Sequence, residues 1–456
     1  MPTIAIVGAG FSGVATAAHL ARLPWPRGLR IVLIERGPRF ARGAAYSTDH
    51  PLHLLNVPAG RMGAFAEDEG HFLRWLQRSE PTVTGDAFVP RARYGEYLEW
   101  LLGEVQWRAS ANVEIEKRHG DVTAVEVEGR GVRVAVQGEW LTCDRVVLAL
   151  GNLPPRDPIG FADGGARYVC DPWVPGAFNS IPKSHLPIVL VGSGLTMVDA
   201  ALALRGSGHT SGFIAVSRHG QLPLSHRDWP AKPPVVDPSA ALERWDGSVS
   251  QLLRTLRQAS RAAGRAGLDW RDVINGLRPI TPQLWHRMTP RERARFVRHV
   301  RPFWETHRHR MSTRISEMVN HMLAVRELAI VAGRIVRVEA GRDSVTVSVR
   351  RRGQETLEHY DAGALVNCTG PDGDFARMAE PMVVSLRTAG VLVPDPLGLG
   401  ILTDSEGALL DANGRAAAAV FTLGSPRRAG DWESTAVPEL RVQADRLARR
   451  LRESLH

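Results

Sequence analysis

Three glycines near the start of the chain have the spacing of a phosphate-binding turn. Gly8, Gly10 and Gly13 form a GxGxxG pattern directly after a short apolar run, and Ser12 lies inside the pattern. In such a turn the first glycine permits the sharp bend, the second lets the backbone approach a pyrophosphate, and the third lets helix and strand pack closely. The spacing therefore predicts a dinucleotide site that these four residues line.

An acidic residue follows at the distance that such a site requires. The next apolar run, residues 30–34, ends at Glu35, which is 22 residues after Gly13. A carboxylate at this place accepts hydrogen bonds from the adenosine ribose. The complete order of strand, glycine turn, helix, strand and acid favours a cofactor site over an incidental surface glutamate, and Arg36 is predicted as a further contact.

The same pattern occurs a second time, with changes that bear on the ligand. Gly192 and Gly194 follow another apolar run and Thr196 lies in the turn, but Met197 replaces the third glycine. This replacement predicts a slightly wider spacing of helix and strand.

The acidic position also changes in the second copy. Ser217 stands where the first copy has Glu35, and Arg218 comes next. An uncharged residue followed by a cation suits a 2′-phosphate, which a carboxylate would repel. The second copy therefore indicates a preference for NADPH.

These residues need two sets of positioning elements. Each copy continues into alternating, strand-rich stretches and ends in an apolar strand that runs into a glycine, Gly151 in the first copy and Gly370 in the second. The order predicts an α/β chain with two Rossmann-like domains, the second inserted in the first. The predicted boundaries are 1–180 and 371–456 for the first dinucleotide-binding domain, 181–230 and 331–370 for the NADPH-binding domain, and 231–330 for a helical insertion. The strands before the two glycine turns are expected at 3–7 and 188–191. In the insertion, a linker-like stretch at 232–238 precedes helical patterns at 249–266, 270–277 and 290–298.

The chain resembles the flavoproteins with two dinucleotide-binding domains, which include flavin-containing, Baeyer-Villiger and N-hydroxylating monooxygenases. Within them it is most similar to the bacterial FAD/NAD(P)-binding oxidoreductases. The resemblance implies FAD on the first glycine turn and NADPH on the second. The motifs that carry it are residues 45–46, 53–62, 93–98, 192–199, 217–220 and 430–443.

By this resemblance, residues 53–62 pass along the flavin ring. Asn56 and Val57 are then expected at the flavin face, with Asn56 as the catalytic candidate that hydrogen-bonds a flavin or peroxide oxygen. The alternative for Asn56 is an ordinary turn residue before Val-Pro, and both interpretations stay open. His50 and His53 are expected to make local hydrogen bonds, since no carboxylate at suitable spacing orients either as an acid or base.

The resemblance also implies that the chain returns to the FAD domain at its end, with a strand at 420–424 and a helix at 434–451. The N-terminus of that helix is expected at the flavin pyrimidine edge, where its dipole favours negative charge on the reduced ring. Two pairs of residues compete for one flavin contact, and the choice stays open. The pairs are Gly424-Ser425 and Gly430-Asp431, and the helix start carries Thr435 and Ala436.

The resemblance implies an NADPH-dependent FAD oxidoreductase, expected to be a monooxygenase that attacks a small amine or anionic substrate through a flavin hydroperoxide formed with molecular oxygen. One alternative is a reductase or oxidase that passes electrons to another acceptor, and another is a cofactor-binding protein without turnover. The three cysteines, Cys143, Cys170 and Cys368, form no CxxC pair. Their spacing counts against a disulfide reductase and fits a reducing, cytoplasmic compartment.

Positive charge is concentrated in the predicted insertion. The chain of 456 residues has a net charge of +9, yet residues 251–330 alone hold 16 Arg and 6 Asp or Glu. A solvated helix face would explain the charge, but arginine also suits bidentate binding of carboxylates and phosphates. We favour the second explanation, with Arg295 and Arg298 as candidates for substrate binding.

Other partners are not favoured by the sequence. No nucleic-acid recognition motif accompanies the charge, and no apolar run reaches the length of about 18 residues that a membrane span needs. His307 and His309 have no further ligands at metal-binding spacing, so no metal site is predicted. A homo-oligomer is compatible with the sequence, which does not determine the oligomeric state.

Overall fold

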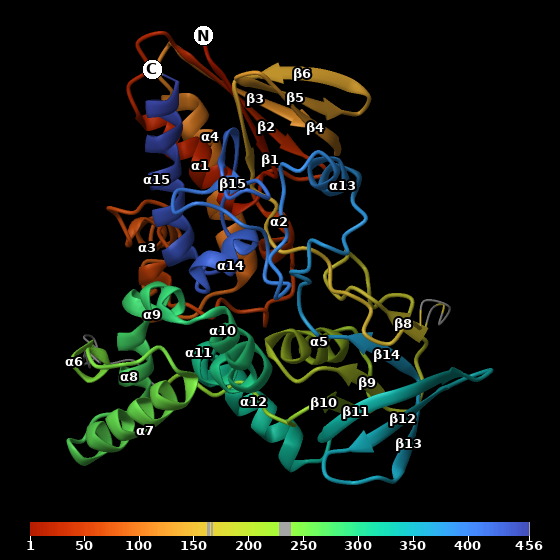
Figure 1. Cartoon of the computed structure of the whole chain (residues 1–456). Helices are drawn as coiled ribbons and strands as arrows, with labels where there is room; N and C mark the ends of the chain where they lie inside the picture. Colours follow the sequence, from red (N-terminus) through yellow and green to blue (C-terminus); the bar gives the residue numbers. More distant parts are fainter. Residues whose placement is uncertain (162–164, 166, 228–238, 456) are drawn as a thin grey trace.

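The first of the two large sheets in the described part of the computed structural model holds the start and the end of the chain (Figure 1). The structure describes residues 1–161, 165, 167–227 and 239–455. The strand order in this sheet is β15-β16-β7-β1-β2-β3, and all neighbours except β15 and β16 run parallel. Its strands are β1 (Thr3–Val7), β2 (Leu29–Glu35), β3 (Val113–His119), β7 (Arg145–Leu148), β15 (Ala408–Leu410) and β16 (Ala416–Thr422).

Both faces of this sheet are covered, which explains why its central strands are apolar throughout. Helices α1, α4 and α15 lie on one face, and a three-stranded meander with α13 lies on the other (Figure 1). These helices are α1 (Phe11–Arg22), α4 (Arg91–Arg108), α13 (Pro381–Thr388) and α15 (Val437–Ser454). The meander is β4 (Val122–Glu128), β5 (Gly131–Val136) and β6 (Glu139–Cys143), and the short helices α2 (Gly43–Tyr46) and α3 (His71–Leu76) lie in the connections.

The second sheet has the order β13-β12-β11-β10-β9-β14-β8 and comes from the middle of the chain. Its strands are β8 (Tyr168–Val169), β9 (Ile188–Val191), β10 (Phe213–Ser217), β11 (Leu328–Ala340), β12 (Val345–Arg351), β13 (Leu357–Ala362) and β14 (Ala364–Asn367). Helices α5 (Leu195–Gly206) and α12 (Thr313–Ala324) pack against it. All seven strands lie between β7 and β15 in the chain, so the predicted fold class is confirmed. Since β8 belongs here, the second sheet begins before residue 181.

The described part of the insertion is helical and has an apolar core that it shares with Leu399, Ala429 and Trp432 of the C-terminal part of the chain. Its helices are α6 (Ser239–Leu242), α7 (Val249–Arg265), α8 (Trp270–Leu277), α9 (Thr281–Arg287), α10 (Pro290–Arg295) and α11 (Arg301–Arg308), with a π-helical turn at Phe296–Val300. The linker-like stretch 232–238 lies outside the described residues. None of the described helices is long and apolar enough to cross a membrane.

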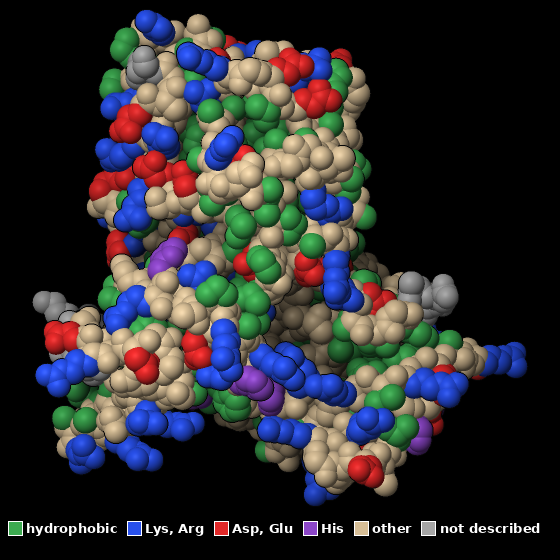
Figure 2. Space-filling model, in the orientation of Figure 1, with side chains coloured by type: hydrophobic (Ala, Val, Ile, Leu, Met, Phe, Trp, Pro, Cys, Tyr) green, Lys and Arg blue, Asp and Glu red, His purple; other side chains and the backbone are tan. Residues whose placement is uncertain are grey.

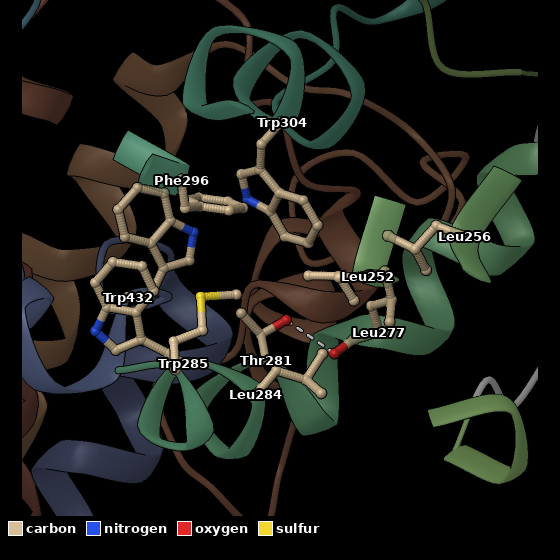
Figure 3. A pocket seen from close by; sticks show the side chains of 10 residues that line it. Leu252, Leu256, Leu277, Thr281, Leu284, Trp285, Phe296, Trp304 and Trp432 are labelled. Atoms are coloured by element: carbon tan, nitrogen blue, oxygen red, sulfur yellow. Dashed lines mark hydrogen bonds between the residues drawn. The ribbon is translucent and has the colours of Figure 1, made fainter. Parts of the chain in front are cut away.

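The insertion packs beneath the FAD part of the chain, against the short helix α14 (Arg428–Asp431) (Figure 1). Trp432 of that region stacks on Trp285 with ring centroids 4.7 Å apart. Figure 3 shows both rings with Phe296 and Trp304 around the apolar centre. The cavity there measures about 20 Å³, which is room for one water molecule. This centre is therefore packed core that joins the two parts of the molecule.

Candidate active site

The first glycine turn leaves no space for side chains. Gly8 has a φ of +100°, and a Cβ there would lie 2.4 Å from the carbonyl oxygen of Ala149. A Cβ on Gly13 would lie 2.0 Å from the carbonyl oxygen of Gly8. Gly10 precedes α1, and no side chain caps the helix. The first N–H groups of α1 are thus left for an anion, which fits a pyrophosphate.

Glu35 is held at the rim of this turn. Its Oε2 accepts a hydrogen bond of 2.8 Å from the Ala9 N–H, and its Oε1 accepts one of 2.7 Å from the Gly37 N–H. An ionised carboxylate has about four acceptor positions, so two remain for ribose hydroxyls. Arg36 is exposed beside it.

The end of the chain reaches the same turn. Gly424 follows β16 with a φ of +82°, and a Cβ on it would lie 3.3 Å from Ser12 Oγ. Gln443 of α15 accepts a 2.9 Å hydrogen bond from the Gly424 N–H and donates one of 3.0 Å to Asp431. The two competing pairs are thus joined through one glutamine, and Gly424 is the member that touches the glycine turn.

Helix α15 starts three residues later than expected, at Val437. Ala436 is its N-terminal cap residue and is half-buried, whereas Thr435 is exposed. Ser434 is fully buried, and its Oγ has no hydrogen-bond partner among the described residues. This hydroxyl adds a donor or acceptor beside the helix start that sequence reasoning missed.

The predicted flavin-face segment is held by a residue that the sequence did not single out. The backbone oxygen of Asn56 lies 3.2 Å from His226 Nε2, while the Asn56 side chain is exposed and Val57 is half-buried. Burial, with a smaller effect of Arg310, lowers the pKa of His226 to about 3. The imidazole is therefore neutral, and its Nε2–H donates to the carbonyl.

The second glycine turn is tightly packed at Gly192 but open at Gly194. A Cβ on Gly192, where φ is +115°, would lie 2.6 Å from the carbonyl oxygen of Cys368, but no atom lies within 4 Å of one on Gly194. Gly194 precedes α5 without a capping side chain, and Thr196 is half-buried in the first turn of that helix. Met197 takes the place of the third glycine and is fully buried in the core.

Ser217 lies where the first copy has its acid. Its Oγ is 2.7 Å from Ser193 Oγ and accepts a 3.0 Å hydrogen bond from the Gly220 N–H. These contacts hold the loop after β10 in place. Arg218 is exposed at the start of this loop.

Several cations surround this loop. Arg352 Nη1 lies 3.2 Å from His219 Nδ1, and the pKa of His219 is lowered by burial, Arg352 and Arg218. Burial, Arg428 and Arg218 contribute to a lowered pKa of Arg301. Figure 2 shows a hollow between the upper body and the lower right lobe, with Lys, Arg and His side chains along its lower edge. A positive potential of this kind attracts phosphates.

A polar contact joins the flavin-face segment to the second domain. Arg91 Nη2 lies 2.7 Å from Asp199 Oδ2. His53 Nε2 lies 2.9 Å from the backbone oxygen of Asp199, and His53 Nδ1 lies 2.7 Å from Thr48 Oγ1. Asp199 is on α5, directly behind the second glycine turn, so the two cofactor sites share one support.

The two arginines expected to bind substrate lie on the outside of the insertion. Arg295 is 46% exposed and pairs with Glu292 at 2.7 Å, and Arg298 is exposed as well. The buried arginines are different ones. Arg278 donates to both oxygens of Glu439 on α15, with 2.8 Å between Nη2 and Oε2, and Arg308 Nη2 lies 3.1 Å from Glu433.

One family model and one curated protein match parts of the chain. Residues 5–153 match the model of the FAD-NAD(P)-binding family. Over 145 residues, 29% of the chain, the sequence is 30% identical to nitrosuccinic acid synthase npaA of Aspergillus oryzae. The match spans only 22% of that protein.

Two solved structures have the same fold over their whole length. The ornithine hydroxylase PvdA of Pseudomonas aeruginosa is 14% identical, with a TM-score of 0.67 and full coverage of both chains. The L-lysine 6-monooxygenase of Pseudomonas syringae is 16% identical, with a TM-score of 0.66 and the same coverage. The chain therefore has the fold of the flavoproteins with two dinucleotide-binding domains, and its residues 5–153 match the model of the FAD-NAD(P)-binding family.

Proposed function

We propose that the chain is an FAD- and NADPH-dependent monooxygenase that hydroxylates the nitrogen of a small amine. The observation that carries this proposal is the nested pair of cofactor sites on a fold shared over the full length with PvdA and the lysine monooxygenase. The partial match to nitrosuccinic acid synthase also supports chemistry at nitrogen. Its substrates would be a small molecule and molecular oxygen.

Each cofactor has a proposed set of contacts. When bound, FAD accepts hydride from NADPH and supplies the electrons that activate oxygen. The residues proposed to hold FAD are Gly8, Gly10, Ser12, Gly13, Glu35, Arg36, Asn56, Val57, Gly151, Gly424, Asp431, Thr435 and Ala436. Those proposed to hold NADPH are Gly192, Gly194, Thr196, Ser217, Arg218 and Gly370.

The chain's own residues would orient the reactants and keep water away. The Asn56 side chain is proposed to hydrogen-bond an oxygen atom at the flavin, since His226 holds the Asn56 backbone from the other side. The N–H groups at the start of α15 would stabilise negative charge on the reduced ring. Arg295 and Arg298 stay candidates only for attracting anions from outside, because both are exposed.

The principal alternative is a reductase or oxidase. A disulfide reductase needs two neighbouring thiols, but Cys143 and Cys368 are buried with raised pKa values, and Cys170 stands alone at the surface. This observation favours oxygen as the acceptor. The unpaired thiols also support a reducing compartment, and we propose the cytoplasm.

Product balance separates these functions. The purified protein should carry yellow flavin and oxidise NADPH faster when its amine is added, with one hydroxylated product for each NADPH consumed. Hydrogen peroxide in place of product would support an oxidase or a reductase. A protein that neither retains FAD nor oxidises NADPH would contradict an enzymatic role.

Arg218 provides the test of cofactor choice. Arg218→Ala should raise the KM for NADPH about 10- to 100-fold, the range expected for one charged hydrogen bond, and leave the KM for NADH unchanged. Arg337→Ala is the control, because Arg337 is exposed on β11, five residues beyond Ala332, the partner of Ser217 in the sheet, and pairs with Glu339. Equal losses for both nucleotides would contradict a 2′-phosphate contact.

A further inference from the structure

A buried guanidinium in the loop after α11 lacks most of its expected partners. Arg310 is 3% exposed. Its Nη2 donates a 2.7 Å hydrogen bond to Asn275 Oδ1. Its Nε and Nη1 have no hydrogen-bond partner among the described residues. Buried polar atoms in proteins are nearly always satisfied, so this exception needs an explanation.

The neighbouring arginines each form an ion pair with a carboxylate, whereas Arg310 forms none among the described residues, and Asp269 acts on it only from beyond ion-pair distance. Arg227 donates to both oxygens of Asp272, with 3.1 Å between Nη1 and Oδ2. Arg271 Nη1 lies 3.0 Å from Asp269 Oδ2. Burial, Arg308 and Arg271 lower the pKa of Arg310 to about 10. A buried guanidinium that forms no ion pair has lost its hydration without full compensation, so a bound anion would stabilise this site.

The position of Arg310 indicates which anion it would serve. Met311 pairs with Leu224 and His226 through backbone hydrogen bonds of 2.8 and 2.7 Å, which places Arg310 beside the His226 ring. His226 in turn touches the backbone of Asn56 at 3.2 Å. Arg310 therefore lies one residue behind the segment proposed to face the flavin. Arg218, by contrast, is the exposed cation at the loop proposed to bind the nucleotide phosphate.

We infer that Arg310 binds the carboxylate of the substrate, so that the substrate is an amine that also bears a carboxylate, rather than a plain amine. This inference rests on the proposed function and adds a residue that sets specificity. Guanidinium forms charge-assisted hydrogen bonds with carboxylates, and its fixed donor geometry orients them. Because both free donors are enclosed, the side chain must turn toward Asn56 as the carboxylate enters.

Thermal unfolding of the FAD-loaded enzyme provides the first test. L-Ornithine, L-lysine and β-alanine are compared with putrescine, cadaverine and ethylamine, their counterparts without the carboxylate. For at least one pair, the acid should increase the Tm of the wild type more than its plain-amine counterpart does. Arg310→Met should abolish this difference. Arg310→Met without ligand should unfold at the wild-type temperature or higher, because it removes an uncompensated charge. Arg337→Met is the exposed control, since Arg337 pairs with Glu339 on the surface and has no proposed part in binding, and it should respond as wild type.

Steady-state kinetics with the same pairs provide the second test. For an acid that is turned over, Arg310→Met should lower kcat/KM about 100-fold and leave its plain-amine counterpart unchanged, while Arg310→Lys should retain an intermediate preference. A Tm that falls in Arg310→Met with the ligand response intact would show a structural role. A weaker NADP+ affinity with unchanged acid preference would assign the anion to the nucleotide. Wild-type shifts that are equal for acids and amines would also overturn the inference.

These outcomes are distinct from failure of the proposed function. That function fails if NADPH does not reduce the bound flavin of the wild type, whichever amine is present. The thermal comparison needs no turnover, so it tests the carboxylate contact in either case.

Discussion

At the scale of the residue, Glu35 and Ser217 occupy equivalent positions in the two proposed cofactor sites, where they would serve different ligands. Each is the last residue of the second strand of a Rossmann-like half, and both are fixed by backbone N–H groups, Glu35 by two and Ser217 by one. The carboxylate keeps free acceptor positions for hydroxyls, whereas the hydroxyl leaves room for a phosphate beside Arg218. The two copies therefore differ in charge at the place where the two cofactors differ.

Replacement of Glu35 by glutamine tests this assignment. Glu35→Gln should weaken FAD about 10- to 100-fold, since charged hydrogen bonds to the ribose and to the glycine turn become neutral ones. Absorbance titration of the flavin-free protein with FAD would measure the change. The control is Glu114→Gln on the neighbouring strand β3, where the side chain is exposed. Similar affinities for both variants would remove Glu35 from the FAD site.

His226 predicts a loss of stability in acid. Its pKa is about 3 in the folded chain against 6.5 when unperturbed. Between these pH values the imidazole is therefore protonated in the unfolded chain and neutral in the folded chain. The contribution of the neutral His226 to the free energy of unfolding is fully present above pH 6.5. It falls by about 1.4 kcal/mol per pH unit as the pH drops below this value. The surrounding charges, Arg310, Arg271 and Arg308, strengthen the effect.

Urea unfolding of the wild type and of His226→Phe at several pH values between about 7.5 and 5 isolates the contribution of His226 to the pH dependence of stability. The phenylalanine keeps a ring against Phe88, whose centroid lies 4.9 Å from that of His226. The wild type should lose more stability per pH unit than the variant, because other buried histidines contribute equally to both. Parallel curves would show that His226 takes up no proton on unfolding.

At the scale of the element, the start of α15 is held from below by the insertion. Glu439, in the first turn, pairs with Arg278, and Glu433, before the helix, pairs with Arg308 and accepts a 3.2 Å hydrogen bond from Trp304. Trp432, directly before Glu433, has a φ of +55°, which is costly for a bulky residue. Part of the arginine surplus thus positions the helix end proposed to face the flavin.

Loss of one carboxylate should loosen this support. Glu439→Gln leaves the largely buried Arg278 without a charged partner, and the free energy of unfolding should fall by about 1 to 3 kcal/mol. Glu453→Gln near the other end of α15 is the control, because that side chain is exposed. Urea unfolding measures both. A change within about 0.5 kcal/mol for Glu439→Gln, the usual range for surface substitutions, would show that the pair does not stabilise the helix.

Local sequence patterns predicted most helices and strands, but they did not predict contacts between residues far apart in the sequence. The apolar runs 3–7 and 188–191 and the helix 270–277 have the predicted bounds in the structure. The helix expected at 290–298 instead ends at Arg295 and passes into a π-helical turn, since Pro302 lacks the N–H that a continuous helix needs.

In the candidate site, too, the local motifs could be predicted from the sequence and the long-range contacts could not. The glycine turns and their acid or cation follow from spacing within 30 residues, because strand, turn and helix are consecutive. The contact of His226 with Asn56 spans 170 residues, and that of Arg91 with Asp199 spans 108. No periodicity connects such positions, so the supports behind the cofactor sites emerged only from the fold. The buried state of Arg310 belongs to this second class.

At the scale of the whole molecule, nesting one domain in the other requires the two cofactor sites to be aligned. Hydride transfer depends on the distance between the two reacting rings, so a small misplacement slows it strongly. Asp199 stands at this junction, since it binds Arg91 of the first domain through its carboxylate and His53 through its backbone oxygen. The ion pair is largely buried, with 17% and 10% of the two side chains exposed.

Asp199→Asn should therefore impair the transfer between the sites and spare each site by itself. The rate of flavin reduction by NADPH, followed anaerobically in a stopped-flow instrument, should fall at least about 10-fold, because the amide cannot hold the Arg91 guanidinium as the carboxylate does. FAD affinity should stay at the wild-type value. Arg205→Ala is the matched control on α5, since Arg205 pairs with Glu327 inside the second domain. If both variants reduce the flavin at the wild-type rate, the junction does not set the alignment. If Asp199→Asn instead loses FAD, its effect lies in the first site.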